Sequence, residues 1–371
     1  MPKVDETRLE IDLKALAHNY QLLAQKLPEQ TQIMGVVKAF AYGTDSITIG
    51  KKLVDLGATY LAVAYIEEGM RFRRRGIGVP ILVFYPQLED LPKLLEYNLI
   101  PSVYNFHFLK KLKAALVEKN IIQFPIHIKI NTGMNRLGFD LKDVDELQNE
   151  LTSGNHFKLE GVFSHLSSAG MPSEDEFTQE QIDKFTDVVE AFRKNVYPDF
   201  KAHLCNSSGI LSHPEAAFDM VRAGIALYGY GNNPEEQKDL QIVASLKTRI
   251  AQLREIPKGS SVGYDRKFKA EKASKIATLP LGYADGISRI YGNQRAEVLI
   301  HGQKAPIVGN VCMDTLMVDV TEIECQEGDE VLVFGKEHTA LDFDKEKQSI
   351  PYELITRISQ RVTRVVLDDY L

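Results

Sequence analysis

The pattern of apolar and polar residues changes once along this chain. From residue 12 to about residue 230, short runs rich in β-branched residues alternate with longer stretches whose apolar residues recur every three or four positions. The short runs predict strands at residues 32–37, 60–63, 81–83, 100–103, 124–130, 159–163, 201–204 and 219–222. The longer stretches predict helices at residues 13–27, 47–56, 88–97, 106–118 and 177–193.

Eight strands alternating with helices over roughly 210 residues are typical of a (β/α)8 barrel. A doubly wound parallel sheet is the alternative. After a polar, turn-rich segment at 228–240, strand-like runs follow one another without long helices. The later strands are expected within 243–253, 275–283, 296–300, 316–320 and 330–334, and a closing helix is expected at 352–367.

The sequence therefore predicts an α/β protein with two domains. We expect an N-terminal TIM-type barrel at residues 1–238 and a mostly β C-terminal domain at residues 239–371.

Composition argues against several classes of partner. The formal net charge of −7 gives no electrostatic reason to expect binding to nucleic acid or to an anionic membrane. No apolar run approaches the ~20 residues of a membrane helix, and the first ten residues lack the apolar core of a signal peptide. Three widely spaced cysteines favour neither a disulfide framework nor a zinc ribbon. We expect a cytoplasmic protein without a bound metal.

Unusual polar residues follow five of the expected barrel strands, at the ends where TIM barrels place their chemistry. They are Lys38, Arg136, His165, the segment CNSSG at 205–209, and Arg222. Each alone is better explained as an ordinary loop residue, and this holds especially for a lone histidine. Five at one rim indicate a functional site.

The last two of these loops point to a phosphate. Residues 206–209 and 222–229 offer hydroxyls and backbone N–H groups, and barrels commonly bind phosphate after their last two strands. Together with a rim lysine, they suggest pyridoxal 5'-phosphate (PLP), which has a phosphate to anchor and an aldehyde that reacts with an amine.

The fifth strand carries an unexpected lysine. Alternation along FPIHIKIN places His127, Lys129 and Asn131 on one face and isoleucines on the other. If the polar face points into the barrel, the Lys129 ammonium is costly to bury unless it is paired or chemically neutralised. Arg136 nearby would make an unmodified Lys129 less favourable still.

Nine motifs in order along nearly the whole chain resemble bacterial alanine racemase. They are VVKAFAYG, NTGMNRLG, SHLSSAG, NSSG, RAGIALYG, SVGY, LGYADGISR, VGNVCMDTLMVDV and PYELITRISQRVTR. The resemblance implies a PLP-dependent isomerase of fold type III that interconverts L- and D-alanine for peptidoglycan. It also implies a homodimer with shared active sites and a first strand, at residues 8–12, that joins the β domain.

The resemblance also implies roles for individual residues. Lys38 would form a Schiff base with PLP and act as one acid/base, and Tyr264 from the partner subunit would act as the other. Arg136 would contact the phenolic oxygen of the cofactor and the substrate. Arg222 would face the pyridine nitrogen, and His165 would link Arg222 to Tyr264.

Further positions follow from the same motifs. Met313 would lie near the substrate carboxylate, and Lys129 matches a position that is often carbamylated in the family. The remaining cofactor-binding positions are Tyr42, Asn206, Ser207, Gly224, Ile225 and Tyr352.

Several residues depart from the family pattern, namely Phe40, Thr44, Asp45, Asn131, Asn135, Gly170, Asp265 and Asn310. They leave the reaction type intact but leave substrate breadth open, so a serine or broad-specificity racemase is the main alternative. A fold type III decarboxylase would be expected to lack SVGY and VCMD in this arrangement. A PLP-carrier protein would lack the second domain.

Overall fold

The computed structural model describes residues 6–346 and 349–367, and its chain divides into two compact units. One unit, the barrel unit, contains Ala17–Ala41 and Ser46–Leu240. The other, the β unit, contains the described residues up to Leu16, the short segment Tyr42–Asp45 and the described residues from Gln241 onward.

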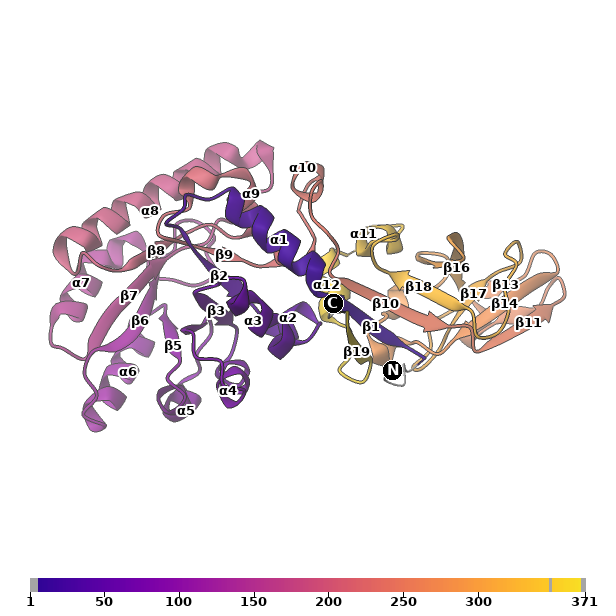
Figure 1. Ribbon diagram of the computed structural model, residues 1–371, viewed down its shortest axis with the longest axis horizontal. Helices are drawn as coiled ribbons and strands as arrows, with labels where there is room; N and C mark the ends of the chain where they lie inside the picture. Colours follow the sequence, from indigo (N-terminus) through magenta and orange to yellow (C-terminus); the bar gives the residue numbers. More distant parts are fainter. Residues whose placement is uncertain (1–5, 347–348, 368–371) are drawn as a thin grey trace. The chain divides into compact units, whose positions relative to one another are not determined.

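Within residues 17–240, eight parallel strands form one sheet in which neighbours along the chain are neighbours in space (Figure 1). Strand β9 pairs with β2, and backbone bonds from Asp219 to Ala202 and from Arg222 to Cys205 join the last two strands. The predicted (β/α)8 barrel is therefore confirmed, and a doubly wound sheet is excluded because its strand order would have to reverse. The strands are β2 (Gln32–Val36), β3 (Tyr60–Val63), β4 (Ile81–Val83), β5 (Ile100–Val103), β6 (Phe124–Lys129), β7 (Phe157–Phe163), β8 (Lys201–His203) and β9 (Met220–Ala223).

The longer helices up to residue 240 each bury one apolar face, as α6 illustrates. Its buried side chains Phe108, Leu112 and Leu116 recur every four residues, and Asn105 caps its first turn by accepting from the Phe108 N–H at 2.8 Å. Among the described residues, no helix has the length and apolar character needed to cross a membrane. The helices are α1 (Leu13–Gln25), α3 (Ser46–Asp55), α4 (Ile66–Arg74), α5 (Leu91–Glu96), α6 (Phe106–Glu118), α7 (Val144–Thr152), α8 (Asp175–Asn195), α9 (Ser207–Ser212) and α10 (Pro234–Gln237). The label α2 in Figure 1 marks Lys38–Tyr42, a short turn whose inner residues have left-handed backbone angles.

The β unit is built on a sheet that has nine strands among the described residues. The N-terminal strand β1 (Arg8–Asp12) lies in this sheet, antiparallel to β10 and parallel to β19. A separate two-stranded ribbon pairs β12 (Ser261–Val262) with β13 (Phe268–Lys269). The other strands are β10 (Ala244–Arg249), β11 (Gln252–Ile256), β14 (Ser274–Leu279), β15 (Glu297–Ile300), β16 (Gln303–Val308), β17 (Leu316–Asp319), β18 (Glu330–Phe334) and β19 (Thr363–Leu367), and the helices are α11 (Ala340–Phe343) and α12 (Pro351–Thr356).

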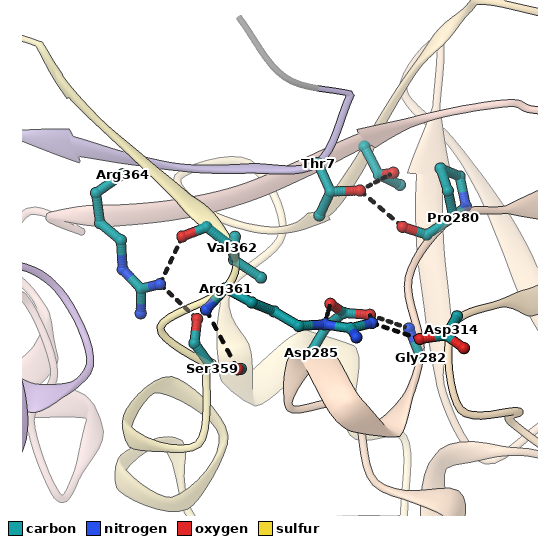
Figure 2. A network of polar contacts seen from close by, with 10 residues as sticks. Thr7, Pro280, Gly282, Asp285, Asp314, Ser359, Arg361, Val362 and Arg364 are labelled. Carbon is teal, nitrogen blue, oxygen red and sulfur yellow. Dashed lines mark hydrogen bonds and ion pairs between the residues drawn. The ribbon is translucent and has the colours of Figure 1, made fainter.

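The prediction of a closing helix at 352–367 is wrong for the second half of this segment. Helix α12 ends at Thr356, and the chain continues into strand β19, which pairs with β1 over the register Arg8–Thr363 to Asp12–Leu367. Between them, Arg361 forms ion pairs with Asp285 at 2.6 Å and with Asp314 at 2.7 Å (Figure 2). Pairing with β1 and the Arg361 ion pairs, all to residues distant in the chain, stabilise a strand where the local periodicity predicts a helix.

Candidate active site

The segment after the first barrel strand has an unusual backbone. Lys38 follows β2, and the next four residues all lie in the left-handed region, with φ between 52° and 56° at Ala39, Phe40, Ala41 and Tyr42. This conformation is unfavourable for residues with a Cβ atom. Lys38 is therefore presented by a left-handed turn that requires external support.

Glu68 supplies that support from the first turn of α4. One of its carboxylate oxygens accepts the Ala39 N–H at 2.7 Å, and the other accepts the N–H groups of Ala64 at 2.7 Å and Tyr65 at 3.2 Å. The carboxylate thus ties the residue after Lys38 to the end of the next barrel strand. Nothing in the sequence marks Glu68 as a functional residue, because a glutamate in the first turn of a helix is common for capping alone.

The Lys38 amine lies in a cationic environment. Burial and the charge of Arg136 lower the pKa of Lys38, and the nearby Glu68 carboxylate opposes this shift only in part. A lowered pKa increases the neutral, nucleophilic fraction of the amine. Lys38 can therefore act as a reactive amine.

Lys129, at the end of β6, is a second confined cation. It is buried, and its Nζ lies 5.3 Å from the centre of the Phe163 ring. Burial, followed by the charges of Arg222, Arg136 and Lys38, lowers the pKa of Lys129 to about 7. No carboxylate among the described residues forms an ion pair with it. Burying the charged form of Lys129 here therefore costs free energy, as the alternation along this strand predicts.

Arg222 is buried at the end of β9, and within residues 6–346 and 349–367 its hydrogen-bond acceptors are all neutral. Its guanidinium donates to Nδ1 of His203 at 2.8 Å and Nδ1 of His165 at 3.2 Å, and it also donates to the backbone carbonyls of Ser164 and Leu204. Burial lowers the pKa of Arg222 to about 10, so it remains charged at neutral pH.

The two histidines beside this guanidinium stay neutral. Burial and the charge of Arg222 lower the pKa of His165 and His203 well below the ordinary value. Because a guanidinium only donates, each Nδ1 must accept and each Nε2 must carry the proton. His203 then donates from Nε2 to Nδ1 of His127 at 2.9 Å, so Arg222 sets the tautomers of a buried chain. The Arg222–His165 hydrogen bond is the first half of the expected link to Tyr264. Nothing in the sequence marks His203, because it reads as an ordinary strand residue.

The loops after β8 and β9 are joined by one hydroxyl. Ser207 Oγ accepts the N–H groups of Gly224 at 3.0 Å and Ala226 at 3.2 Å, and it keeps its own proton to donate. Asn206 caps α9 by accepting the Gly209 N–H at 3.0 Å. The structure therefore brings together the expected cofactor-binding positions Asn206, Ser207, Gly224 and Ile225.

Two further expected positions meet in the β unit. The rings of Tyr42 and Tyr352 lie 6.2 Å apart although they are distant in the chain, and burial raises the pKa of Tyr42. Arg364 holds the backbone after Tyr42 by donating to the carbonyls of Gly43 at 2.8 Å and Thr44 at 3.2 Å. Gly43 must be glycine, since its φ is 84° and a Cβ atom would lie 2.0 Å from the Ile355 carbonyl oxygen.

Tyr264 and Met313 lie in exposed loops of the β unit. Tyr264 is 69% exposed and Met313 is 54% exposed. The loops are tied together, since Asn310 Nδ2 donates to the Tyr264 carbonyl at 3.3 Å and the Ala284 N–H donates to the Met313 carbonyl at 3.0 Å. Arg136 is likewise exposed, and no hydrogen bond or ion pair holds it among the described residues.

Comparisons with known proteins cover both units. Residues 11–232 match the alanine racemase N-terminal domain and residues 243–366 match the alanine racemase C-terminal domain. Alanine racemase 2 of Caldanaerobacter subterraneus subsp. tengcongensis is 37% identical over 98% of this chain and 96% of its own length. The alanine racemase of Halothermothrix orenii is 39% identical over 96% of each chain.

Solved structures agree with these matches. The alanine racemase of Streptomyces lavendulae has a TM-score of 0.91 at 30% identity and covers 98% of this chain and 97% of its own. The Bartonella henselae enzyme, solved with covalently bound pyridoxal phosphate, has a TM-score of 0.87 at 30% identity. The match covers 98% of this chain and 99% of the Bartonella chain. With both domain types matched in order and relatives above 30% identity along nearly its whole length, this chain belongs to the alanine racemase family.

Proposed function

We propose that this protein interconverts L-alanine and D-alanine with PLP as its cofactor. The family match supports this reaction over a serine or broad-specificity racemase, and the matched C-terminal domain argues against a PLP-carrier protein. The single observation that carries the proposal is the cluster of Lys38, Lys129 and Arg222 at one barrel rim, where Lys38 has a lowered pKa and Arg222 has only neutral acceptors.

The barrel rim fits an anionic cofactor. Arg222, and Lys129 while it is unmodified, are buried cations that no carboxylate pairs with among the described residues, so an anionic phosphate ester would offset the positive charge at this rim. The Ser207 hydroxyl retains a proton to donate to a phosphate. The proposed phosphate-binding residues are Tyr42, Ser207, Gly224, Ile225 and Tyr352, and Asn206 is a further proposed cofactor-binding residue.

Arg222 and Arg136 would orient the ring of the cofactor. A guanidinium has no acceptor, so Arg222 can contact the pyridine nitrogen only by donating to it, which disfavours a proton on that nitrogen. PLP, when bound, supplies a conjugated ring that delocalises charge from the substrate Cα. Arg136 would contact the phenolic oxygen and, with Met313, the substrate carboxylate.

Lys38 and Tyr264 are the proposed acid/base pair. Lys38 would attach the cofactor and exchange the Cα proton on one face, and Tyr264 would exchange it on the other. The lowered pKa of Lys38 suits a base that works near neutral pH. His165 would link Arg222 to Tyr264 through its protonated Nε2.

We further propose that Lys129 is carbamylated. Its pKa of about 7 leaves a large neutral fraction at neutral pH, and a neutral amine can form an N–C bond to CO2 with release of one proton. The product is an anion, which would relieve the repulsion with Arg136 and Arg222. Labelled bicarbonate should give one carbamate carbon signal in the wild type and none in Lys129→Ala. An unchanged spectrum would contradict the modification.

The β unit suggests a homodimer. Large apolar side chains lie exposed at Tyr264, Tyr283 and Met313, on loops that backbone and Asn310 hydrogen bonds join to one another. Exposed apolar surface shared by neighbouring loops marks an interaction site. We propose that a second copy of the chain covers them, so that each site takes Lys38 from one subunit and Tyr264 from the other. A cytoplasmic location is proposed as well, in keeping with three unpaired cysteines.

Chiral chromatography tests the function directly. Incubation with either enantiomer of alanine should give a racemic mixture, and serine and lysine should react much more slowly. Borohydride treatment of the PLP-loaded protein should fix the cofactor on Lys38. Labelling of another lysine would refute the site, and preferential turnover of serine would refute the substrate.

A further inference from the structure

The turn that carries Tyr264 is conformationally strained. Tyr264 opens the short helical turn η6 (Tyr264–Arg266) between β12 and β13, and φ is 72° at Gly263, 62° at Asp265 and 51° at Arg266. Gly263 tolerates this region, aspartate visits it more readily than most residues, and arginine does so rarely. The backbone that aims Tyr264 therefore needs contacts from outside the turn.

Asn310 provides these contacts. Its Nδ2 donates both to the Tyr264 carbonyl at 3.3 Å and to Asp265 Oδ2 at 3.0 Å, and its Oδ1 accepts from Asn293 Nδ2 at 3.2 Å. Asn310 is buried, with 8% of its surface exposed. The preceding Gly309 brings the backbone close to β12, since a Cβ atom there would lie 2.7 Å from the Val262 carbonyl oxygen. The Asn310 side-chain amide is thus held by Asn293 through its Oδ1, and it binds the Tyr264 turn through its Nδ2.

Asp265 completes the arrangement. Its carboxylate accepts from Asn310 and lies 3.8 Å from the guanidinium of Arg289. The Tyr264 side chain itself is 69% exposed, so packing within its own unit does little to hold it. The direction of the phenol is consequently set by the backbone of the turn.

We propose that Asn310 and Asp265 are a coupled pair of positioning residues that orient Tyr264. The proposal rests on the proposed function only in so far as Tyr264 exchanges a proton with the substrate. Its structural half, that the pair holds the turn, stands independently.

The first test measures the turn in the PLP-loaded protein. Asn310→Ala and Asp265→Ala should each make amide deuterium exchange at residues 261–268 about tenfold faster. Each variant loses a hydrogen bond that stabilises the closed turn, and the free energy of one such bond corresponds to about this factor. Asn195→Ala is the matched control, since it removes the bond from Asn195 Nδ2 to Gln148 Oε1 in the barrel unit and should leave these amides unchanged. Unchanged uptake in both turn variants would overturn the proposal.

The second test measures catalysis. Asn310→Ala should lower kcat by about tenfold with little change in KM, and it should slow deuterium wash-in for one alanine enantiomer only. The double variant should lose little more than the worse single variant, because the two residues act together. Equal losses of wash-in from both enantiomers, or fully additive losses, would show a general structural defect and overturn the pairing.

Tyr264→Phe separates the two levels of inference. If this variant racemises alanine normally, the proposed role of Tyr264 fails, whereas the exchange result at residues 261–268 still decides whether Asn310 and Asp265 hold the turn. The swapped variant Asp265→Asn with Asn310→Asp can restore the bond between the two side chains. It places a carboxylate against the Tyr264 carbonyl, so it should stay defective, and full recovery would show that the contact to Tyr264 is irrelevant.

Discussion

Replacing Glu68 by glutamine should weaken PLP binding although Glu68 is outside the proposed set of cofactor-binding residues. The left-handed segment Ala39–Tyr42 contains four residues with Cβ atoms, at roughly 1–2 kcal/mol each, so its conformation costs about 4–8 kcal/mol. The Glu68 carboxylate offsets part of this by accepting three backbone N–H groups, one of which belongs to Ala39.

The size of the effect follows from the loss of one acceptor. Glutamine keeps one oxygen, so either the Ala39 N–H or the pair at Ala64 and Tyr65 faces an amide N–H and loses its partner. A hydrogen bond to a charged group contributes about 1.5–3 kcal/mol. A loss of about 2 kcal/mol corresponds to roughly a 30-fold weaker affinity. The pKa of Lys38 should also fall further, because Glu68 is the group that raises it.

The assay is titration of the apoprotein with PLP, followed by the absorbance of the bound cofactor. The neighbouring Glu67→Gln is the matched control, since it makes the same charge change on the same helix. In the part of the chain that the structure describes, Glu67 forms one ion pair, with Lys93 at 2.9 Å, and this exposed pair contributes little. If Glu68→Gln binds PLP as tightly as Glu67→Gln does, the carboxylate does not support the turn and the reasoning is refuted.

Other predictions concern the turn, the buried lysine and the dimer. Ala39→Gly should stabilise the protein by up to about 1 kcal/mol, because glycine relieves the left-handed strain, and a lower urea midpoint would contradict this. Unmodified Lys129 has a folded pKa of about 7, below its unfolded value of about 10.4. The unfolded state therefore binds more protons between these values, so stability should rise with pH across that window and Lys129→Met should flatten the rise. Co-refolding Lys38→Ala with Tyr264→Phe should recover roughly a quarter of wild-type activity if half of the dimers are mixed and sites are shared. No recovery despite proven mixed dimers would place both residues in one chain.

Much of the fold could be predicted because buried elements have a recognisable local pattern of apolar residues. A parallel strand covered on both faces reads as a short apolar run, so the eight barrel strands were found with ends within about two residues of those observed. The candidate site followed for the same reason, since Lys38, His165 and Arg222 stand at or just beyond strand ends. The ordered motifs then indicated the family to which the chain belongs.

The tertiary structure decided what depends on partners distant in the chain. Residues 363–367 fit a helical period as well as a strand, and only pairing with β1 selects the strand. Three hydrogen bonds illustrate this, because each joins residues whose local sequence patterns are ordinary. They are the bonds from Ala39 to Glu68, from Arg222 to His203 and from Asn310 to Asp265. Periodicity records which face of an element is buried, but it does not record which side chain lies opposite, because that depends on how the chain folds back on itself.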